Sequence, residues 1–147
     1  MRQHFWERAL HIWCWLVAGF GLMFACGGLA ATDAGAGLYF WLVSAGQLDA
    51  ASFNAAGLRS TVAVMGAVMF GWGWTMIALY RAVGPDAGIW RGVSWSVLGW
   101  FVVDSSLSVA TGLTGNAIAN TLFLVMFLVP AVKLGFFRPE TVSRSPA

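Results

Sequence analysis

The hydrophobic positions of this chain gather in four long stretches; short turns separate the last three, and a longer segment, residues 32–59, separates the first two. Only one of the four, the third, contains a charged residue, Asp104. The uninterrupted runs cover residues 9–31, 60–80, 92–112 and 116–132. Each run is close to the ~20 residues that a helix needs to cross about 30 Å of hydrocarbon. The pattern predicts transmembrane helices over about residues 9–31, 58–82, 88–112 and 115–136.

Short connections between consecutive spans favour antiparallel neighbours. The predicted fold is therefore all-α: a polytopic membrane protein with an antiparallel four-transmembrane-helix bundle and a short outer interfacial segment. The bundle forms a single membrane domain over residues 1–138. Residues 139–147 are expected to be a short, disordered cytoplasmic tail.

The composition agrees with a lipid environment. Of the 147 residues, 59% are hydrophobic and 10% are charged, and the mean hydropathy is +0.76. A soluble domain carries about 25% charged residues, and a small one buries only about 60–70% of its chain surface. The net charge of +2 is too small to indicate a nucleic-acid partner. The lipid bilayer is therefore the expected partner.

Basic residues alternate with the spans. The segment between the first and second spans contains Asp33 and Asp49 but no Lys or Arg before Arg59, and the turn between the third and fourth spans is uncharged. The other segments contain the basic residues Arg2, Arg8, Arg81, Arg91, Lys133, Arg138 and Arg144. Lys and Arg concentrate in cytoplasmic loops. The pattern predicts a multi-pass protein of the cell inner (plasma) membrane with both termini in the cytoplasm, and Arg59 is its one exception.

The segment around residues 35–46 contains a short aromatic and aliphatic run, LYFWLV, at residues 38–43. This run is too short to span a bilayer. Two interpretations stay open. It forms an interfacial or re-entrant helix on the outer face, with Tyr39, Phe40 and Trp41 among the headgroups, or a hydrophobic loop over the mouth of the bundle. Either arrangement could act as a lid.

Small residues indicate where the helices approach one another closely. In the second span, Ala63, Ala67 and Gly71 recur at a spacing of four and predict a tight packing stripe. In the third span, a line of small or polar residues at the same spacing includes Asp104 and is expected to face inward. Trp6, Trp13, Trp41 and Trp90 suit the two membrane interfaces.

Asp104 is the strongest candidate for a functional residue. A carboxylate on a helix within the hydrocarbon region of the membrane costs at least about 2.5–3.5 kcal/mol on insertion scales, so Asp104 should be paired, hydrated or protonated. Polar residues at similar depth in the outer half predict a pocket formed by Arg59, Asp104, Ser105, Ser108, Asn116 and Asn120. The pocket is either a site for a polar head group, an ion or a proton, or a hydrogen-bonded cluster that fixes helix register.

Other kinds of chemistry find little support in the sequence. It contains no phosphate loop, dinucleotide fingerprint, nucleophile elbow or zincin motif. The two histidines, His4 and His11, lie near one end of the first span, and a metal site needs three or four ligands. No metal site is therefore predicted, and no cofactor is specified. Nine Trp residues indicate either a cavity for a flat lipophilic molecule or bulky side chains packed opposite glycines.

The layout resembles that of small four-span bacterial inner-membrane proteins of unknown function. The resemblance rests on the aromatic insert LYFWLV, on the Leu58-Arg59 start of a Gly/Ala-rich second span and on the acid-bearing third span WFVVDSSLSVATG. It covers most of the chain and implies the architecture alone.

Three functions are therefore compatible with the sequence. The first is a non-enzymatic membrane protein that binds a small amphiphilic ligand, or a partner membrane subunit, through the outer polar pocket. The second is a small membrane enzyme or an ion- or proton-coupled carrier that uses Asp104. The third is a structural accessory subunit of a larger membrane complex. A lipophilic small molecule, a second copy of the chain and another membrane protein all remain as partners.

Overall fold

The computed structural model describes residues 2–48, 52 and 55–138, and this part of the chain is helical with no strand. The predicted tail, 139–147, lies outside the described residues. The helices in chain order are α1 (Arg2–Cys26), α2 (Ala34–Val43), α3 (Ala56–Val83), α4 (Ala87–Ala110) and α5 (Thr114–Lys133).

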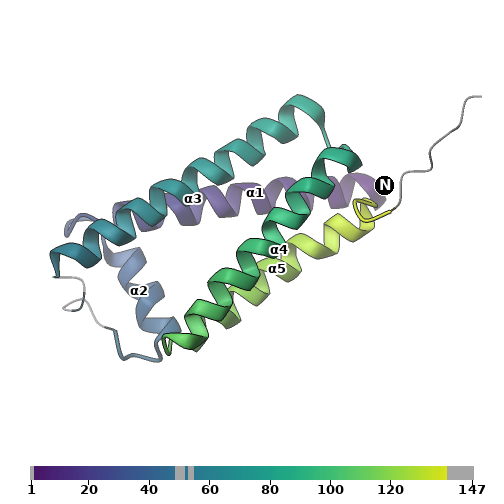
Figure 1. The fold of residues 1–147 in the computed structure, drawn as a ribbon. Helices are drawn as coiled ribbons and strands as arrows, with labels where there is room; N and C mark the ends of the chain where they lie inside the picture. Colours follow the sequence, from purple (N-terminus) through teal and green to yellow (C-terminus); the bar gives the residue numbers. More distant parts are fainter. Residues whose placement is uncertain (1, 49–51, 53–54, 139–147) are drawn as a thin grey trace, which may run out of the picture.

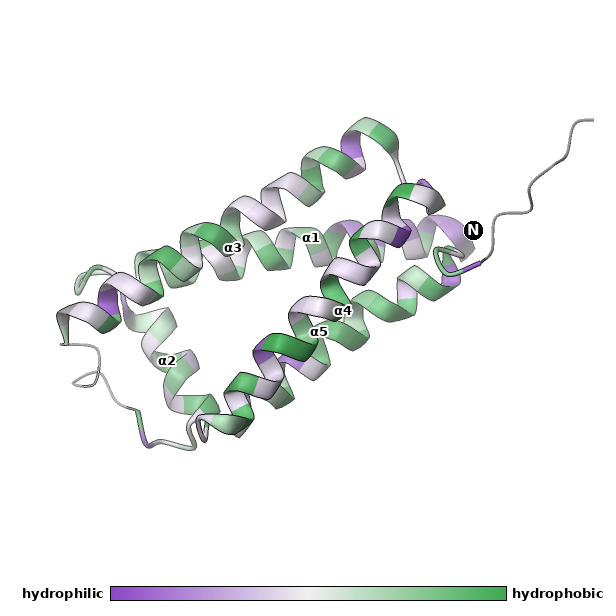
Figure 2. Ribbon diagram, viewed as in Figure 1, coloured by the Kyte–Doolittle hydropathy of each residue, from purple (hydrophilic) through white to green (hydrophobic). Residues whose placement is uncertain are grey.

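The four long helices, α1, α3, α4 and α5, are long and apolar enough to cross a membrane. Hydrophobic residues dominate all four along their length (Figure 2). The fold prediction is confirmed: the chain forms an all-α bundle whose four apolar helices fit an integral membrane protein.

The long helices are arranged as two antiparallel pairs, α1 with α3 and α4 with α5 (Figure 1). The pairs meet mainly through α1 and α5 near the end that holds the N-terminus, and they diverge toward the opposite end. We call these the termini end and the α2 end, because α2 lies across the gap between the two pairs at the latter. The divergence leaves space inside the molecule at the α2 end.

Glycines bring α1 and α3 into backbone contact. A Cβ atom added to Gly66 would overlap the backbone of Phe24 and Ala25, and one added to Gly21 would overlap the backbone of Phe70. Of the predicted stripe, Ala63 packs against Gly28 just after the end of α1, but Ala67 and Gly71 do not contact another of the described helices. Ala67 is exposed, and a Cβ on Gly71 would meet nothing within 4 Å. The glycines that contact α1, Gly66 and Gly73, lie roughly a third of a turn away from Ala67 and Gly71.

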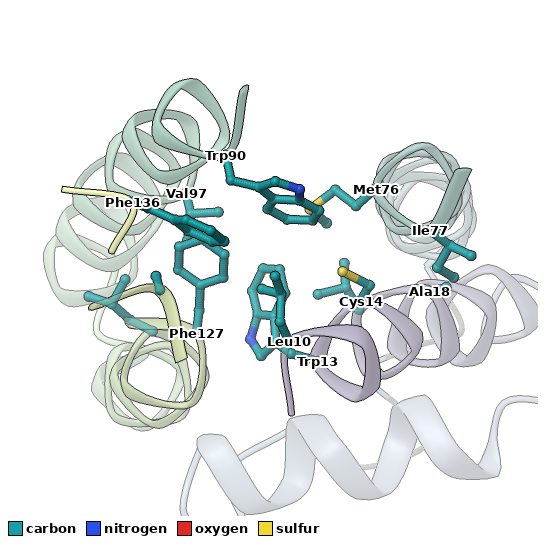
Figure 3. Close-up of a cluster of buried hydrophobic side chains, with 13 residues drawn as sticks. Leu10, Trp13, Cys14, Ala18, Met76, Ile77, Trp90, Val97, Phe127 and Phe136 are labelled. Atoms are coloured by element: carbon teal, nitrogen blue, oxygen red, sulfur yellow. The ribbon is translucent and has the colours of Figure 1, made fainter. Parts of the chain in front are cut away.

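A hydrophobic core with four large aromatic side chains joins the two pairs in the termini half. Trp13 of α1 and Trp90 of α4 point toward each other there, beside Phe127 and Phe136 (Figure 3). The sequence suggests interfacial indoles at Trp13 and Trp90, but both are fully buried. Their N–H groups find backbone acceptors: Trp13 donates to Phe123 O at 2.9 Å and Trp90 to Gly84 O at 2.8 Å. Burial is tolerated because each N–H is satisfied.

The segment predicted at residues 35–46 contains a helix, α2, so the loop interpretation is wrong. It contacts α1 on one side and α5 on the other. The approach to α5 is close, since a Cβ on Gly115 would overlap the carbonyl of Val43. Helix α2 therefore bridges the two helix pairs where they diverge.

Candidate functional site

A cavity of about 1010 Å³ lies between the two helix pairs in the α2 half of the molecule. All five helices contribute to it. Helices α1 and α3 supply a mainly apolar wall that includes Phe20, Phe24 and Met69. Helices α4 and α5 supply the opposite, more polar wall, and Tyr39 and Phe40 of α2 close the α2 end.

Asp104 lies at the centre of the polar wall, where four neutral side chains surround it. Asn120 Nδ2 donates to Asp104 Oδ2 at 2.9 Å. Asn116 Nδ2 and Ser108 Oγ each lie 3.4 Å from Asp104 Oδ1, and Asn116 Nδ2 donates to Ser108 Oγ at 2.7 Å. Ser105 Oγ lies 3.4 Å from Asn120 Nδ2. We call these five residues the polar cluster.

Helical spacing builds the cluster. Asp104 and Ser108 are one turn apart on α4, and Asn116 and Asn120 are one turn apart on α5, so each pair lies on one face of its helix. The short connection between Ala110 and Thr114 makes the two helices antiparallel neighbours. The two faces then meet at the same depth, which is why five of the six predicted pocket residues come together.

Arg59, the sixth, is placed elsewhere. Its guanidinium Nη1 lies 2.9 Å from Asp33 Oδ2, and both side chains are largely buried. Arg59 does not line the cavity. The physical reason is proximity: the turn after α1 stays beside the first turns of α3, where Gly28 packs against Ala63. Asp33 therefore meets Arg59 near the α2 end, and the ion pair links the start of α2 to α3.

Tyr39 joins the cluster from α2, because its hydroxyl donates to Asn116 Oδ1. Burial raises the pKa of Tyr39 to about 12, and the negative charge of Asp104 acts in the same direction. The phenol therefore stays protonated at neutral pH and remains a hydrogen-bond donor. This bond connects α2 directly to the polar wall.

Tryptophans form the inner end of the cavity. The rings of Trp72 and Trp100 lie 6.1 Å apart, with Phe123 beside them, and all three residues line the cavity. Trp100 lies one turn from Asp104 on α4. The cavity thus has an aromatic base, an apolar wall and a polar wall.

The cavity opens sideways between α3 and α4. Lining residues on these two helices are exposed: Val68 by 68%, Leu107 by 60% and Met65 by 43%. Side chains exposed on a helix that spans a membrane face lipid. The opening therefore gives a bilayer component a lateral route to the polar cluster.

Chemically, this arrangement suits binding. A few convergent polar groups in a mostly apolar cavity are typical of small-molecule sites, whose volumes run to about 1,000 Å³. Within the described residues, no group of three or more His, Cys, Asp or Glu side chains could hold a metal ion.

No protein-family model, curated protein or solved structure matches this chain.

Tyr39 and the tryptophan base are parts of the site that the sequence pattern does not indicate. Tyr39 belongs to the short aromatic segment, and the headgroup role suggested for that segment gave no reason to turn its hydroxyl toward Asn116. For Trp72 and Trp100, the sequence indicates only that a lipophilic cavity is one of two explanations for the many tryptophans. Which tryptophans line a cavity depends on how the two helix pairs diverge.

Proposed function

We propose that this protein is a non-enzymatic membrane protein that binds one small amphiphile of the bilayer in the cavity between its helix pairs. The supporting observation is the contrast between the cavity walls. Asp104, Ser108, Asn116 and Asn120 line one side, whereas Ser105 contacts Asn120 without lining the cavity. Phe20, Phe24 and Met69 line the other side. A molecule with a polar head and an apolar body can satisfy both sides at once.

Binding is favoured over catalysis because the cluster offers one carboxylate surrounded by amides and hydroxyls. General acid–base chemistry uses a positioned group that exchanges a proton with the substrate near neutral pH. Among the described residues that line the cavity, no His, Cys, Glu or Lys lies beside Asp104 to relay a proton, and the surrounding walls provide area for an apolar body.

We also infer that the protein resides in the inner (plasma) membrane with both termini in the cytoplasm, so that the cavity opens within the outer half of the bilayer. The basic residues Arg8, Arg81, Arg91 and Lys133 lie in helices that begin or end at the termini end. Arg59, the exception, is paired with Asp33. Pairing lowers the cost of placing an arginine on the other side.

The test is native mass spectrometry of the gently solubilised protein, combined with lipid extraction and an absorbance spectrum. Ala119 lines the cavity, and Ala67 is exposed on α3 outside it. We expect a single small molecule bound at a fixed ratio in the wild type and in Ala67→Trp, but weakened or lost in Ala119→Trp, because an indole at position 119 takes up the part of the cavity next to Asn116 and Asn120.

A bare wild-type protein would refute the proposal. The same holds for an adduct that survives undiminished in a folded Ala119→Trp variant, and for a second polypeptide bound in place of a small molecule. That last result would favour a subunit of a larger membrane complex. The thermal melting temperature of each variant checks that it is folded.

A further inference from the structure

The amphiphile proposed above would present its head group to a wall that contains a single carboxylate. Among the residues that line the cavity in the described part of the chain, Asp104 is the only Asp, Glu, Lys or Arg. The sign of the charge in the cavity is therefore set by one side chain. This feature bears on which head group the cavity accepts.

The carboxylate is held by neutral donors and retains capacity to accept more hydrogen bonds. An ionised carboxylate has about four lone-pair positions. Asn120 occupies one at 2.9 Å, whereas Ser108 and Asn116 approach the other oxygen only to 3.4 Å. Asn116 donates at a shorter distance to Ser108 Oγ, 2.7 Å. Both oxygens of Asp104 thus retain capacity to accept a strong hydrogen bond from a ligand: Oδ2 has one donor and Oδ1 has only two long contacts.

The aromatic side chains near the carboxylate suit the same kind of head group. Trp100 lies one helical turn from Asp104, and Trp72 and Tyr39 line the same cavity from α3 and α2. The faces of aromatic rings carry partial negative charge and attract cations. An anionic head group would meet repulsion from Asp104 and would gain no such attraction from the rings.

We infer that the cavity is selective for a cationic amphiphile, one whose protonated amine donates to Asp104 while its apolar body lies along Trp72, Met69 and Phe20. This inference rests on the proposed function and names the chemical class of its ligand. A charge-assisted hydrogen bond is about twice as strong as a neutral one. A neutral head group of the same size would gain less from the same position.

The experiment compares three probes with the same alkyl chain: dodecylammonium, dodecanol and dodecanoate. Each is titrated into the protein in nanodiscs of zwitterionic lipid, and binding is followed by tryptophan fluorescence. We expect dodecylammonium to bind the wild type about tenfold or more tightly than dodecanol, as a charge-assisted bond allows. Dodecanoate should bind more weakly than either.

Asp104→Asn should remove this preference, weakening dodecylammonium by about tenfold and changing dodecanol by less than about twofold. Asp86→Asn is the matched control. It removes the same charge outside the cavity, and an asparagine can still cap α4 as Asp86 does through Ile89 N. It should leave the affinity for all three probes unchanged.

Equal binding of dodecylammonium and dodecanol to the wild type would overturn the inference and leave the proposed function intact. Loss of both probes in a folded Asp104→Asn variant would also overturn it, because the carboxylate would then maintain the shape of the cavity rather than select a charge. Failure of every probe to bind, together with a bare wild-type protein in mass spectrometry, would refute the proposed function itself. Selectivity among probes is measured on the wild type, so poor folding of a variant cannot hide the answer.

Discussion

The charge of Asp104 is accommodated by residues that are near it in sequence or one helix away. Ser105 and Ser108 come from the same helix, and Asn116 and Asn120 come from the next one along the chain. These residues could be predicted, because a spacing of four on two neighbouring antiparallel helices places them at one depth. Tyr39 could not, because its position depends on how α2 packs against α5.

The ionisation of Tyr39 tests its place in the site. The chain has two tyrosines, so Tyr80→Phe leaves Tyr39 as the only phenol. Burial, with the charge of Asp104 as a second cause, raises the pKa of Tyr39 to about 12. We therefore expect the phenolate absorbance of Tyr80→Phe to reach half its final value near pH 12. Adding Asp104→Asn should lower this midpoint, although burial keeps it above the usual value of about 10.

The direction of this pKa shift also fixes how Tyr39 contributes to the stability of the fold as the pH changes. Because the pKa is raised in the folded state, the contribution of Tyr39 is complete below about pH 10, the pKa of an unfolded tyrosine. It is lost as the pH rises toward about 12. A midpoint near pH 10 in a protein that circular dichroism shows to be helical would contradict the buried position of Tyr39. The double variant Tyr39→Phe/Tyr80→Phe should give no such absorbance change.

At the level of helices, the packing of α1 against α3 depends on glycines at particular positions. Helix α3 contains small residues on almost every face, including Ala63, Gly66, Ala67, Gly71 and Gly73. Small residues permit close approach, but they do not choose the partner helix. The sequence therefore indicated that α3 packs tightly and left open which face does so. The contact with α1 determines which face of α3 packs tightly.

Replacing two of these glycines by alanine separates packing from helix propensity. Alanine has a higher intrinsic helix propensity than glycine, so both substitutions should stabilise α3 to a similar extent, by up to about 1 kcal/mol. Gly66→Ala would also force a Cβ into the backbone of α1, whereas Gly71→Ala would meet open space. We expect Gly66→Ala to lower the free energy of unfolding by about 1–3 kcal/mol, in the range of other overpacking substitutions. Gly71→Ala should leave it unchanged or slightly raised.

The measurement is denaturation by sodium dodecyl sulfate in mixed micelles, followed by circular dichroism. Equal effects of the two substitutions would mean that α1 and α3 do not approach through Gly66. The native mass of each variant shows whether Gly71 instead contributes to contact between copies of the chain.

At the level of the whole molecule, the site exists because the two helix pairs are joined at one end and open at the other. The aromatic core around Trp13 and Trp90 fixes the termini end, and α2 with the Asp33–Arg59 ion pair bridges the α2 end. The number and order of the spans could be predicted from hydrophobic runs. The divergence of the pairs could not, because lipid-facing and buried side chains are equally apolar in a membrane protein.

The orientation of the molecule decides which leaflet supplies the ligand. Gln47 is exposed beyond α2, and Gln3 is exposed at the start of α1, so Gln47→Cys and Gln3→Cys place the same new thiol at opposite ends. Basic residues favour the cytoplasmic side, and they gather at the termini end. We expect a membrane-impermeant maleimide to label Gln47→Cys in intact spheroplasts and Gln3→Cys only after permeabilisation. The unsubstituted protein measures background labelling of Cys14 and Cys26. The reverse pattern would turn the cavity toward the cytoplasmic leaflet, and a cationic ligand would then have to come from inside the cell.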